Sequence, residues 1–151
     1  MTYEQKINMA KARGINISDV LLENRNIVGI YKFFYYNDNE EICFYIGKST
    51  DIIGRLFGSS DGHIYMYLKN NLSKLVPCKI DEYIKKGYKI SVKIQEIEYH
   101  DTSFSRASHR LALAELQEIV SYQEKGQCLF QFPDGVGKNE QKFWADNYRK
   151  Q

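Results

Sequence analysis

Two tyrosines and two cations stand in an order that suits phosphate chemistry. Tyr31 and Tyr45 lie in two segments rich in β-branched and aromatic residues, and Lys48 and Arg55 follow the second segment. Cleavage of a phosphodiester builds negative charge on the phosphoryl and leaving oxygens, and fixed cations lower that barrier. These residue types therefore indicate phosphoryl chemistry, in which the two hydroxyls bind a phosphate or a water molecule.

We expect the two tyrosines to meet across a β-hairpin. Residues 28–36 and 42–46 favour strands, and the polar stretch between them is typical of a turn. Strand side chains alternate between faces, so cross-strand partners on one face need position numbers with an even sum. A turn centred on Asp38 would place Tyr31 directly opposite Tyr45, with Cβ atoms about 4.5–5.5 Å apart. The alternative is an aromatic pair that only packs.

The longest predicted helix, residues 104–125, offers the carboxylates Glu115 and Glu118. At about 100° per residue, Glu115 falls inside an apolar arc and Glu118 outside it. The arc consists of Leu111, Ala112, Leu116, Ile119 and Val120. A carboxylate on an apolar stripe is costly unless it is paired or binds a metal, and one carboxylate completed by water and phosphate is typical of magnesium. Glu115 is the predicted metal ligand and Glu118 the alternative; an ion pair with Arg110 or Lys48 would be a purely structural explanation of Glu115.

The elements that must position these side chains predict an α+β domain. Besides the hairpin, the pattern favours helices over residues 3–13, 18–23, 51–57, 63–72, 79–86, 104–125 and 139–148, and a third strand over residues 88–98. The expected fold is a small antiparallel, three-stranded sheet flanked by helices, with short helical extensions at both termini. Residues 1–26 would form the N-terminal extension, residues 27–125 the central domain, and residues 126–151 a C-terminal loop and helix packed on the same domain.

The composition is that of an ordinary globular protein. The 151 residues include 43% hydrophobic and 26% charged residues, so one compact domain is expected, and a formal net charge of +2 does not by itself indicate nucleic-acid binding. The scattered Cys43, Cys78 and Cys128 argue against a zinc site or a disulfide framework. The polar N-terminus is no secretory signal and no apolar run would span a membrane, so we expect a cytoplasmic protein without a membrane partner.

The tripeptides Gly29-Ile30-Tyr31 and Tyr45-Ile46-Gly47 resemble the two half-motifs of the GIY-YIG nuclease family. The lysine and arginine that follow, and a glutamate-bearing helix after the third strand, extend this resemblance over residues 27–125, the expected nuclease domain. The resemblance implies an endonuclease that hydrolyses DNA phosphodiester bonds with one divalent cation, Mg²⁺ or Mn²⁺.

The resemblance also implies a role for each candidate residue. Arg55 would bind the scissile phosphate, and Glu115 would hold the metal ion. Tyr31, with Lys48 beside it, would act as or orient the general base for the attacking water, and Tyr45 would hold the phosphate or the water. For Arg55 the structural alternative is a surface ion pair with Asp51, worth only about 0.2–0.5 kcal/mol.

Two positions depart from the family pattern. Many members carry a histidine one turn after the helix arginine, where this chain has Ser59. His63 lies further on, and it would join the site if the loop before it folds back. Members often have an asparagine soon after the glutamate helix, whereas the next one here is Asn139.

DNA is the expected partner, and the candidate contacts are basic residues on both sides of the third strand. They are Lys69, Lys74, Lys79, Lys85, Lys86, Lys89, Arg106, His109 and Arg110. A few phosphate contacts would give salt-dependent binding. Specificity would be low, or would come from the terminal extensions and a homo-oligomer, and restriction, phage, mobile-element and repair roles all stay open. The alternative is a GIY-YIG module that has lost catalysis and binds DNA or a protein partner.

Overall fold

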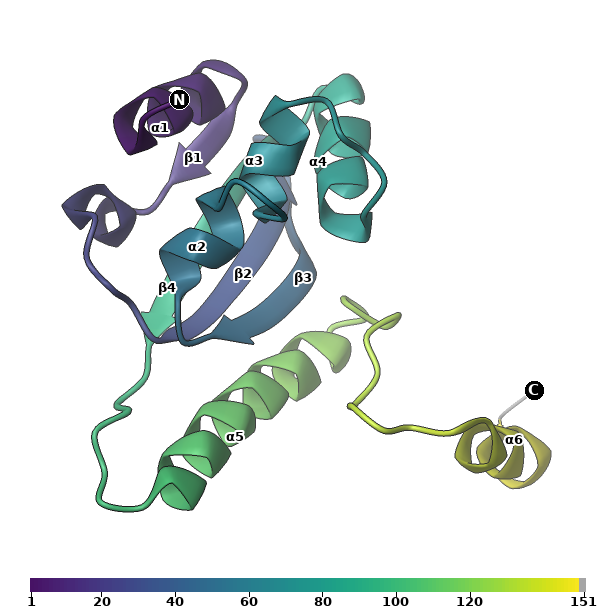
Figure 1. Cartoon of the computed structure of the whole chain (residues 1–151). Coiled ribbons are helices and arrows are strands. Elements are labelled where there is room, and N and C mark those ends of the chain that lie inside the picture. The colour runs from purple at the N-terminus through teal and green to yellow at the C-terminus, as the bar shows by residue number, and fades with distance from the viewer. Residues whose placement is uncertain (150–151) are drawn as a thin grey trace.

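The computed structural model describes residues 1–149 of the chain. Its elements, in chain order (Figure 1), are α1 (Tyr3–Ala12), β1 (Ile15–Ile17), the 3-10 helix η1 (Asp19–Glu23), β2 (Gly29–Tyr36), β3 (Glu41–Ser49), α2 (Ile52–Phe57), α3 (His63–Leu68), α4 (Leu75–Lys85), β4 (Lys89–Glu96), α5 (Phe104–Gln123) and α6 (Lys138–Asn147). The fold is α+β, as expected from the sequence. None of the described helices is both long and apolar enough to cross a membrane.

Helix α1 begins with a capping box and is attached to helix α2. The Thr2 side chain accepts a hydrogen bond from the Gln5 backbone, and the Gln5 side chain accepts one from the Thr2 backbone. The buried Lys6 ammonium donates a 2.6 Å hydrogen bond to the carbonyl of Phe57, the last residue of α2. It also lies 4.1 Å from the centre of the Tyr65 ring. The N-terminal helix therefore fixes the end of the short helix that carries Arg55.

Four strands form one mixed sheet in the order β1-β4-β2-β3. Strand β2 pairs antiparallel with both β3 and β4, as the hairpin and the third predicted strand require. Strand β1, however, pairs in parallel with β4, so the prediction of a three-stranded antiparallel sheet is wrong. This strand is only three residues long, and its partner lies far along the chain, so no local turn or alternation signal marks it.

The register of the hairpin also differs from the prediction. Between Phe33 and Phe34 the pairing shifts by one residue, and Phe44 becomes an extra residue in β3. A β-bulge of this kind changes the sum of paired position numbers along the hairpin. The prediction that Tyr31 lies directly opposite Tyr45 is therefore wrong, and the two tyrosines are diagonal neighbours on one face.

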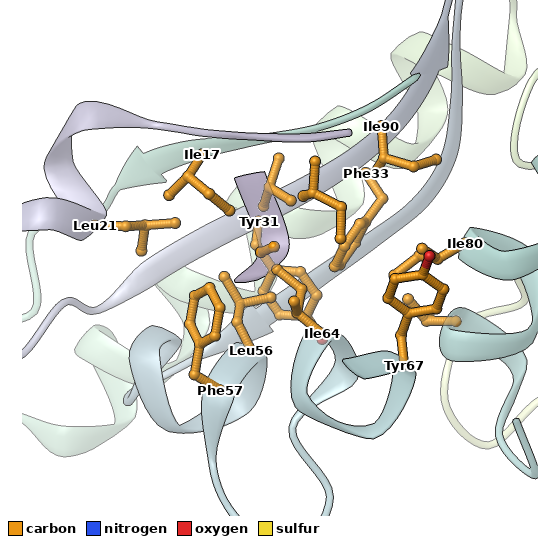
Figure 2. Packing of buried hydrophobic residues seen from close by; sticks show 14 of the residues in the cluster. Ile17, Leu21, Tyr31, Phe33, Leu56, Phe57, Ile64, Tyr67, Ile80 and Ile90 are labelled. Atoms are coloured by element: carbon orange, nitrogen blue, oxygen red, sulfur yellow. The ribbon is translucent and has the colours of Figure 1, made fainter. Parts of the chain in front are cut away.

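Helices cover both faces of the sheet, and each face has its own core. Helices α1 to α4 cover one face, and α5 lies along the other (Figure 1). The larger core, under α1 to α4, contains aromatic and branched aliphatic side chains from every strand (Figure 2). Tyr31 and Phe33 are buried at its centre. The smaller core, under α5, is built from Ile30, Phe34, Cys43, Ile46, Leu111, Ala114 and Cys128.

The C-terminal segment divides into a docked loop and a projecting helix. Cys128, in the loop after α5, is buried in the smaller core. In contrast, none of the described residues of α6 is buried, and this helix stands away from the sheet (Figure 1). The loop thus contributes to the smaller core, whereas α6 projects from it.

Candidate active site

The glycines of the two tripeptides lie where a side chain would collide with a neighbour. Gly47 is the cross-strand partner of Tyr31, and a Cβ atom at Gly47 would lie 2.3 Å from the Tyr31 hydroxyl oxygen. A Cβ at Gly29 would lie 2.1 Å from the carbonyl oxygen of Gln95 in β4. Gly47 thus lets the Tyr31 ring lie across β3, and Gly29 lets β2 approach β4 closely.

Tyr31, Tyr45 and His63 form one aromatic cluster on the face covered by α1 to α4. The ring centres of the two tyrosines are 6.2 Å apart, and the His63 ring centre lies 5.6 Å from Tyr31 and 5.7 Å from Tyr45. The Tyr31 hydroxyl and His63 Nε2 are 3.1 Å apart, within hydrogen-bond distance. His63 begins α3, so the loop between α2 and α3 does fold back and bring this histidine to the tyrosines.

Burial keeps all three groups of this cluster uncharged near neutral pH. Burial, with Tyr45 adding to it, raises the pKa of Tyr31 well above its usual value, although Arg55 acts in the opposite direction. Burial also raises the pKa of Tyr45. Burial, followed by the charge of Arg55, lowers the pKa of His63 to about 3. A phenolate base is therefore disfavoured at Tyr31, and the histidine is a neutral imidazole that can accept the tyrosine proton in a hydrogen bond.

Arg55 projects from α2 beside this cluster and is partly open to solvent. The Asp51 side chain caps α2 by accepting from the Gly54 backbone. The suggested surface pair of Arg55 with Asp51 is absent from the described ion pairs, and Arg55 lies 3.6 Å from Asp61 in the loop before α3. With 37% of its side chain exposed, Arg55 is accessible to a ligand.

On the opposite face, two lysine–glutamate pairs connect the hairpin to α5. Lys48 Nζ lies 3.9 Å from Glu115 Oε1, and Lys32 Nζ lies 3.1 Å from Glu118 Oε1. Arg110 does not take part, because it pairs with Asp101. The looser Lys48–Glu115 pair lies at the end of β3 that follows Tyr45, whereas the tighter Lys32–Glu118 pair lies under β2.

The predicted apolar arc of α5 coincides only in part with the face that packs on the sheet, and Leu111 and Ile119 of that arc do contribute to the smaller core. The buried residues of α5 are Ala107, Leu111 and Ala114, while Leu116 and Val120 are exposed to 43% and 53%. The helix is apolar on both sides, and the two alanines allow a close approach to the sheet. Glu118 therefore lies toward the sheet, paired with Lys32, although the sequence placed it outside the apolar arc. Glu115 lies at the boundary, with 19% of its side chain exposed.

The donor set around Glu115 fits a magnesium ion held by one carboxylate. Within residues 1–149 no group of three or more histidine, cysteine, aspartate and glutamate side chains converges on one point. A closed zinc-type site is thus not formed there, whereas magnesium commonly takes one or two carboxylates and completes its shell with water and phosphate. Burial raises the pKa of Glu115, Lys48 opposes this change and Asp134 adds to it. A cation at this carboxylate would relieve the cost of its burial.

Several of the predicted DNA contacts have acidic partners on the protein. Arg106 and Arg110 both bind the Asp101 carboxylate, at 2.9 and 2.8 Å. These two guanidinium groups and the Ser103 backbone hold the pKa of Asp101 well below its usual range. On α4, Lys79 pairs with Glu82, and Lys85 pairs with Asp81. Exposed pairs of this kind are weak, so DNA phosphates can compete for these cations, but the surface is less basic than the sequence suggested.

Three acidic or basic side chains near the site were not foreseen from the sequence. Asp61 is the neighbour of Arg55, and Asp134 adds to the raised pKa values of Tyr45 and Glu115, after burial. Lys6 fixes the end of α2 from outside the expected nuclease domain. Of these three side chains, only Asp61 could have been identified from the sequence, because it lies in the short loop between Arg55 and His63.

The predicted site residues therefore form two neighbouring groups around β3. Tyr31, Tyr45 and His63 lie on one face of the sheet with Arg55 beside them, while Lys48 and Glu115 meet from the other face. Glu115 is close enough to act on both tyrosines, since it adds to their raised pKa values after burial. Comparison of this chain with protein-family models, curated protein sequences and solved structures found no match in any of the three.

Proposed function

We propose that this chain is a metal-dependent DNA endonuclease of the GIY-YIG type, which hydrolyses phosphodiester bonds. One observation carries this proposal. The two tyrosines of the motif, His63 and Arg55 lie together on one side of β3, and the Lys48–Glu115 pair lies at the same end of that strand. Phenol, guanidinium, ammonium and carboxylate groups in this arrangement suit a phosphodiester and its attacking water.

Tyr31 and His63 would orient the nucleophilic water. The raised pKa of Tyr31, due to burial, keeps its hydroxyl protonated. With Nε2 of His63 unprotonated, this hydroxyl would donate its hydrogen to that nitrogen, 3.1 Å away, which leaves the phenol oxygen to accept a hydrogen bond from the water. Tyr31 would thus act as an orienting group rather than as a phenolate base. Tyr45, its diagonal neighbour, would donate to a phosphate oxygen.

Arg55, Lys48 and Glu115 would act on the charge of the phosphate. Arg55 has an exposed guanidinium that can leave the weak contact with Asp61 and bind a phosphoryl oxygen as negative charge develops there. Lys48 is held 3.9 Å from Glu115 and supplies a second positive charge. Glu115 would hold the Mg²⁺ or Mn²⁺ ion, which when bound supplies charge stabilisation to the leaving oxygen.

The proposal is tested by incubating the full chain with supercoiled plasmid at increasing Mg²⁺ concentration. We expect nicked and linear products with Mg²⁺, no products in excess EDTA, and recovery when Mg²⁺ is restored. Arg55→Ala should lower the cleavage rate by about 100-fold or more, as removal of a group that stabilises transition-state charge commonly does. Lys142→Ala is the matched control, because it removes an exposed cation that pairs with Asp146 on α6, outside the candidate site, and it should leave the rate within a few-fold.

The same assay distinguishes the alternative, a module that binds without cutting. The acidic partners of the α4 and α5 cations suit a protein that holds DNA weakly or contacts another protein. Plasmid that stays supercoiled at every metal concentration, although a gel-shift experiment shows binding, would replace the nuclease by this module. Cleavage that persists in EDTA would overturn the metal-dependent mechanism.

A further inference from the structure

Two cysteines that are far apart in the sequence lie in contact inside the smaller core. Cys43 is on β3 and Cys128 is in the loop after α5, and both are buried. Their sulfur atoms are 3.6 Å apart, and the Cys128 thiol also lies 3.4 Å from the Cys43 carbonyl oxygen. The third cysteine, Cys78, is exposed on α4. The chain thus has one adjacent pair of thiols and one separate thiol that can serve as an internal control.

The loop that carries Cys128 is held on β3 by glutamine side chains. The Gln127 amide oxygen accepts from the Cys43 backbone at 2.8 Å. The Gln131 amide accepts from the Ile46 backbone at 2.9 Å and donates to the Ile46 carbonyl at 2.8 Å. A second anchor comes from Gln123 of α5, which donates to the carbonyls of Cys128 and Gln131. These bonds keep the two sulfurs together without a covalent link between the loop and the strand.

We propose that Cys43 and Cys128 are an oxidisable pair, which a peroxide converts to a disulfide that fastens the C-terminal loop to β3. One of the two sulfurs attacks a peroxide oxygen, the O–O bond breaks, and one water and a sulfenic acid form. The other sulfur then attacks the oxidised sulfur and releases a second water. The two thiols lose two electrons and two protons, and one hydrogen peroxide is reduced to two waters. This inference does not depend on the proposed nuclease function.

The geometry suits this reaction better than either cysteine alone would. The sulfur atoms must close from 3.6 Å to about 2.05 Å, a shift that the loop can make more easily than the paired strand. Cys128 has a positive φ of 58°, which is uncommon for a residue other than glycine and indicates a loop held by its surroundings. The Cys128 thiol donates to the Cys43 sulfur, so the two groups share one hydrogen bond and either sulfur is in reach of the other once it is oxidised.

The test uses the full chain carrying Cys78→Ser, which leaves only the adjacent pair. After treatment with hydrogen peroxide and removal of the excess, free thiols are counted in denaturant and the intact mass is measured. We expect both thiols to disappear, the mass to fall by that of two hydrogen atoms, and a digest to yield one peptide pair joining Cys43 to Cys128. Dithiothreitol should restore both thiols. The melting temperature of the oxidised form should be several degrees higher, because a cross-link between distant residues constrains the unfolded chain.

Matched variants separate this reaction from general oxidation. Two variants, Cys43→Ser and Cys128→Ser, are each combined with Cys78→Ser and so keep one thiol. Their melting temperatures should not rise on peroxide treatment. Cys43→Ala combined with Cys78→Ser provides the same single-thiol control if the serine at the buried position prevents folding. Retention of two free thiols, separate sulfinic acids on the two cysteines, or a cross-linked product that melts at a lower temperature would each overturn the proposal.

Discussion

The two faces of the sheet are built from different chemistry. The face under α1 to α4 is a continuous hydrocarbon and aromatic core, and Tyr31, Tyr45 and His63 belong to it or pack against it. The face under α5 has a smaller core, interrupted by the Lys32–Glu118 and Lys48–Glu115 pairs. The difference suggests a division of labour. The first face holds the phenols by packing, and the second carries charged groups, which under the proposed function would exchange partners when a substrate or metal binds.

The largest expected effect concerns the charged face. Glu115→Gln should lower plasmid cleavage by about 1,000-fold, equivalent to about 4 kcal/mol, because the proposed metal ion would lose its protein carboxylate. The free energy of unfolding should change by less than about 1 kcal/mol, since Glu115 is only loosely paired with Lys48 at 3.9 Å. Cleavage rates across a Mg²⁺ titration, with urea unfolding curves alongside, measure both quantities.

Glu118→Gln is the matched variant for this prediction. It should keep the cleavage rate within a few-fold while losing about 1 kcal/mol of stability, because Glu118 pairs with Lys32 at 3.1 Å in a partly buried position. An active Glu115→Gln together with an inactive Glu118→Gln would mean that Glu118, and not Glu115, holds the metal ion. The roles of the two lysine–glutamate pairs would then be reversed.

The second prediction concerns the packed face. Gly47→Ala should destabilise the fold by about 3 kcal/mol, the upper end of the cost of overpacking a core, because its Cβ would lie 2.3 Å from the Tyr31 hydroxyl oxygen. Urea unfolding gives this value. Gly137→Ala is the control, since no atom lies within 4 Å of a Cβ built there, and it should change stability by less than about 0.5 kcal/mol. Equal stability of the two variants would show that Tyr31 is free to move.

The third prediction is a pH dependence that follows from His63. Burial lowers the pKa of His63 to about 3 in the folded chain, against about 6.5 in an unfolded chain. Above pH 6.5 both forms are neutral and stability is complete. As the pH falls toward 3, His63 binds a proton in the unfolded chain but stays neutral in the folded chain. The free energy of unfolding therefore decreases, by about 2 kcal/mol at pH 5.

This dependence is isolated by comparing two proteins. Unfolding free energies are measured at pH 8 and pH 5 for the wild type and for His63→Gln, which cannot take up this proton. Carboxylates contribute in both proteins, so the difference between the two slopes reports His63. Parallel slopes would mean that His63 is solvated and is not part of the packed face.

The smallest expected effect tests which side of α5 packs. Leu116→Gln should change the free energy of unfolding by less than about 0.5 kcal/mol, because Leu116 is 43% exposed. Leu111→Ala, on the buried side of the same helix, should cost about 2–4 kcal/mol. Denaturation of the two variants at one temperature gives the contrast, and a larger loss for Leu116→Gln would mean that α5 packs through its other side.

Local sequence signals predicted most of the helices and strands, but they did not predict the pairing of strands that lie far apart in the chain. The hairpin, its turn and the long helix follow from β-branched segments, polar turn residues and helical periodicity, and each appears close to its expected position. Strand β1 was missed because its three residues pair with β4, far along the chain. The bulge at Phe44 was missed because an even-sum rule assumes a regular ladder.

The sequence predicted part of the spatial grouping of the candidate residues, and their role as a site stays a prediction. The sequence identified Tyr31 and Tyr45 as neighbours and proposed His63 as a third member, and the three rings do meet. The packing side of α5 was predicted only in part, because that helix carries apolar residues on both sides: Leu111 packs on the sheet, whereas Leu116 and Val120 are exposed. Asp134, which acts on Glu115, comes from a loop whose path no periodicity describes.

The glutamine contacts on β3 have a consequence for how copies of the protein behave at high concentration. An outer strand leaves backbone N–H and C=O groups open, and such a strand is a template for addition of a strand from another molecule. β3 is at one end of the sheet, and the amides of Gln127 and Gln131 occupy its open groups at Cys43 and Ile46. At the other end, β1 is only three residues long. A truncation after Lys125 would therefore expose the unpaired backbone groups of β3, and insoluble aggregates would appear before any loss of the hairpin itself.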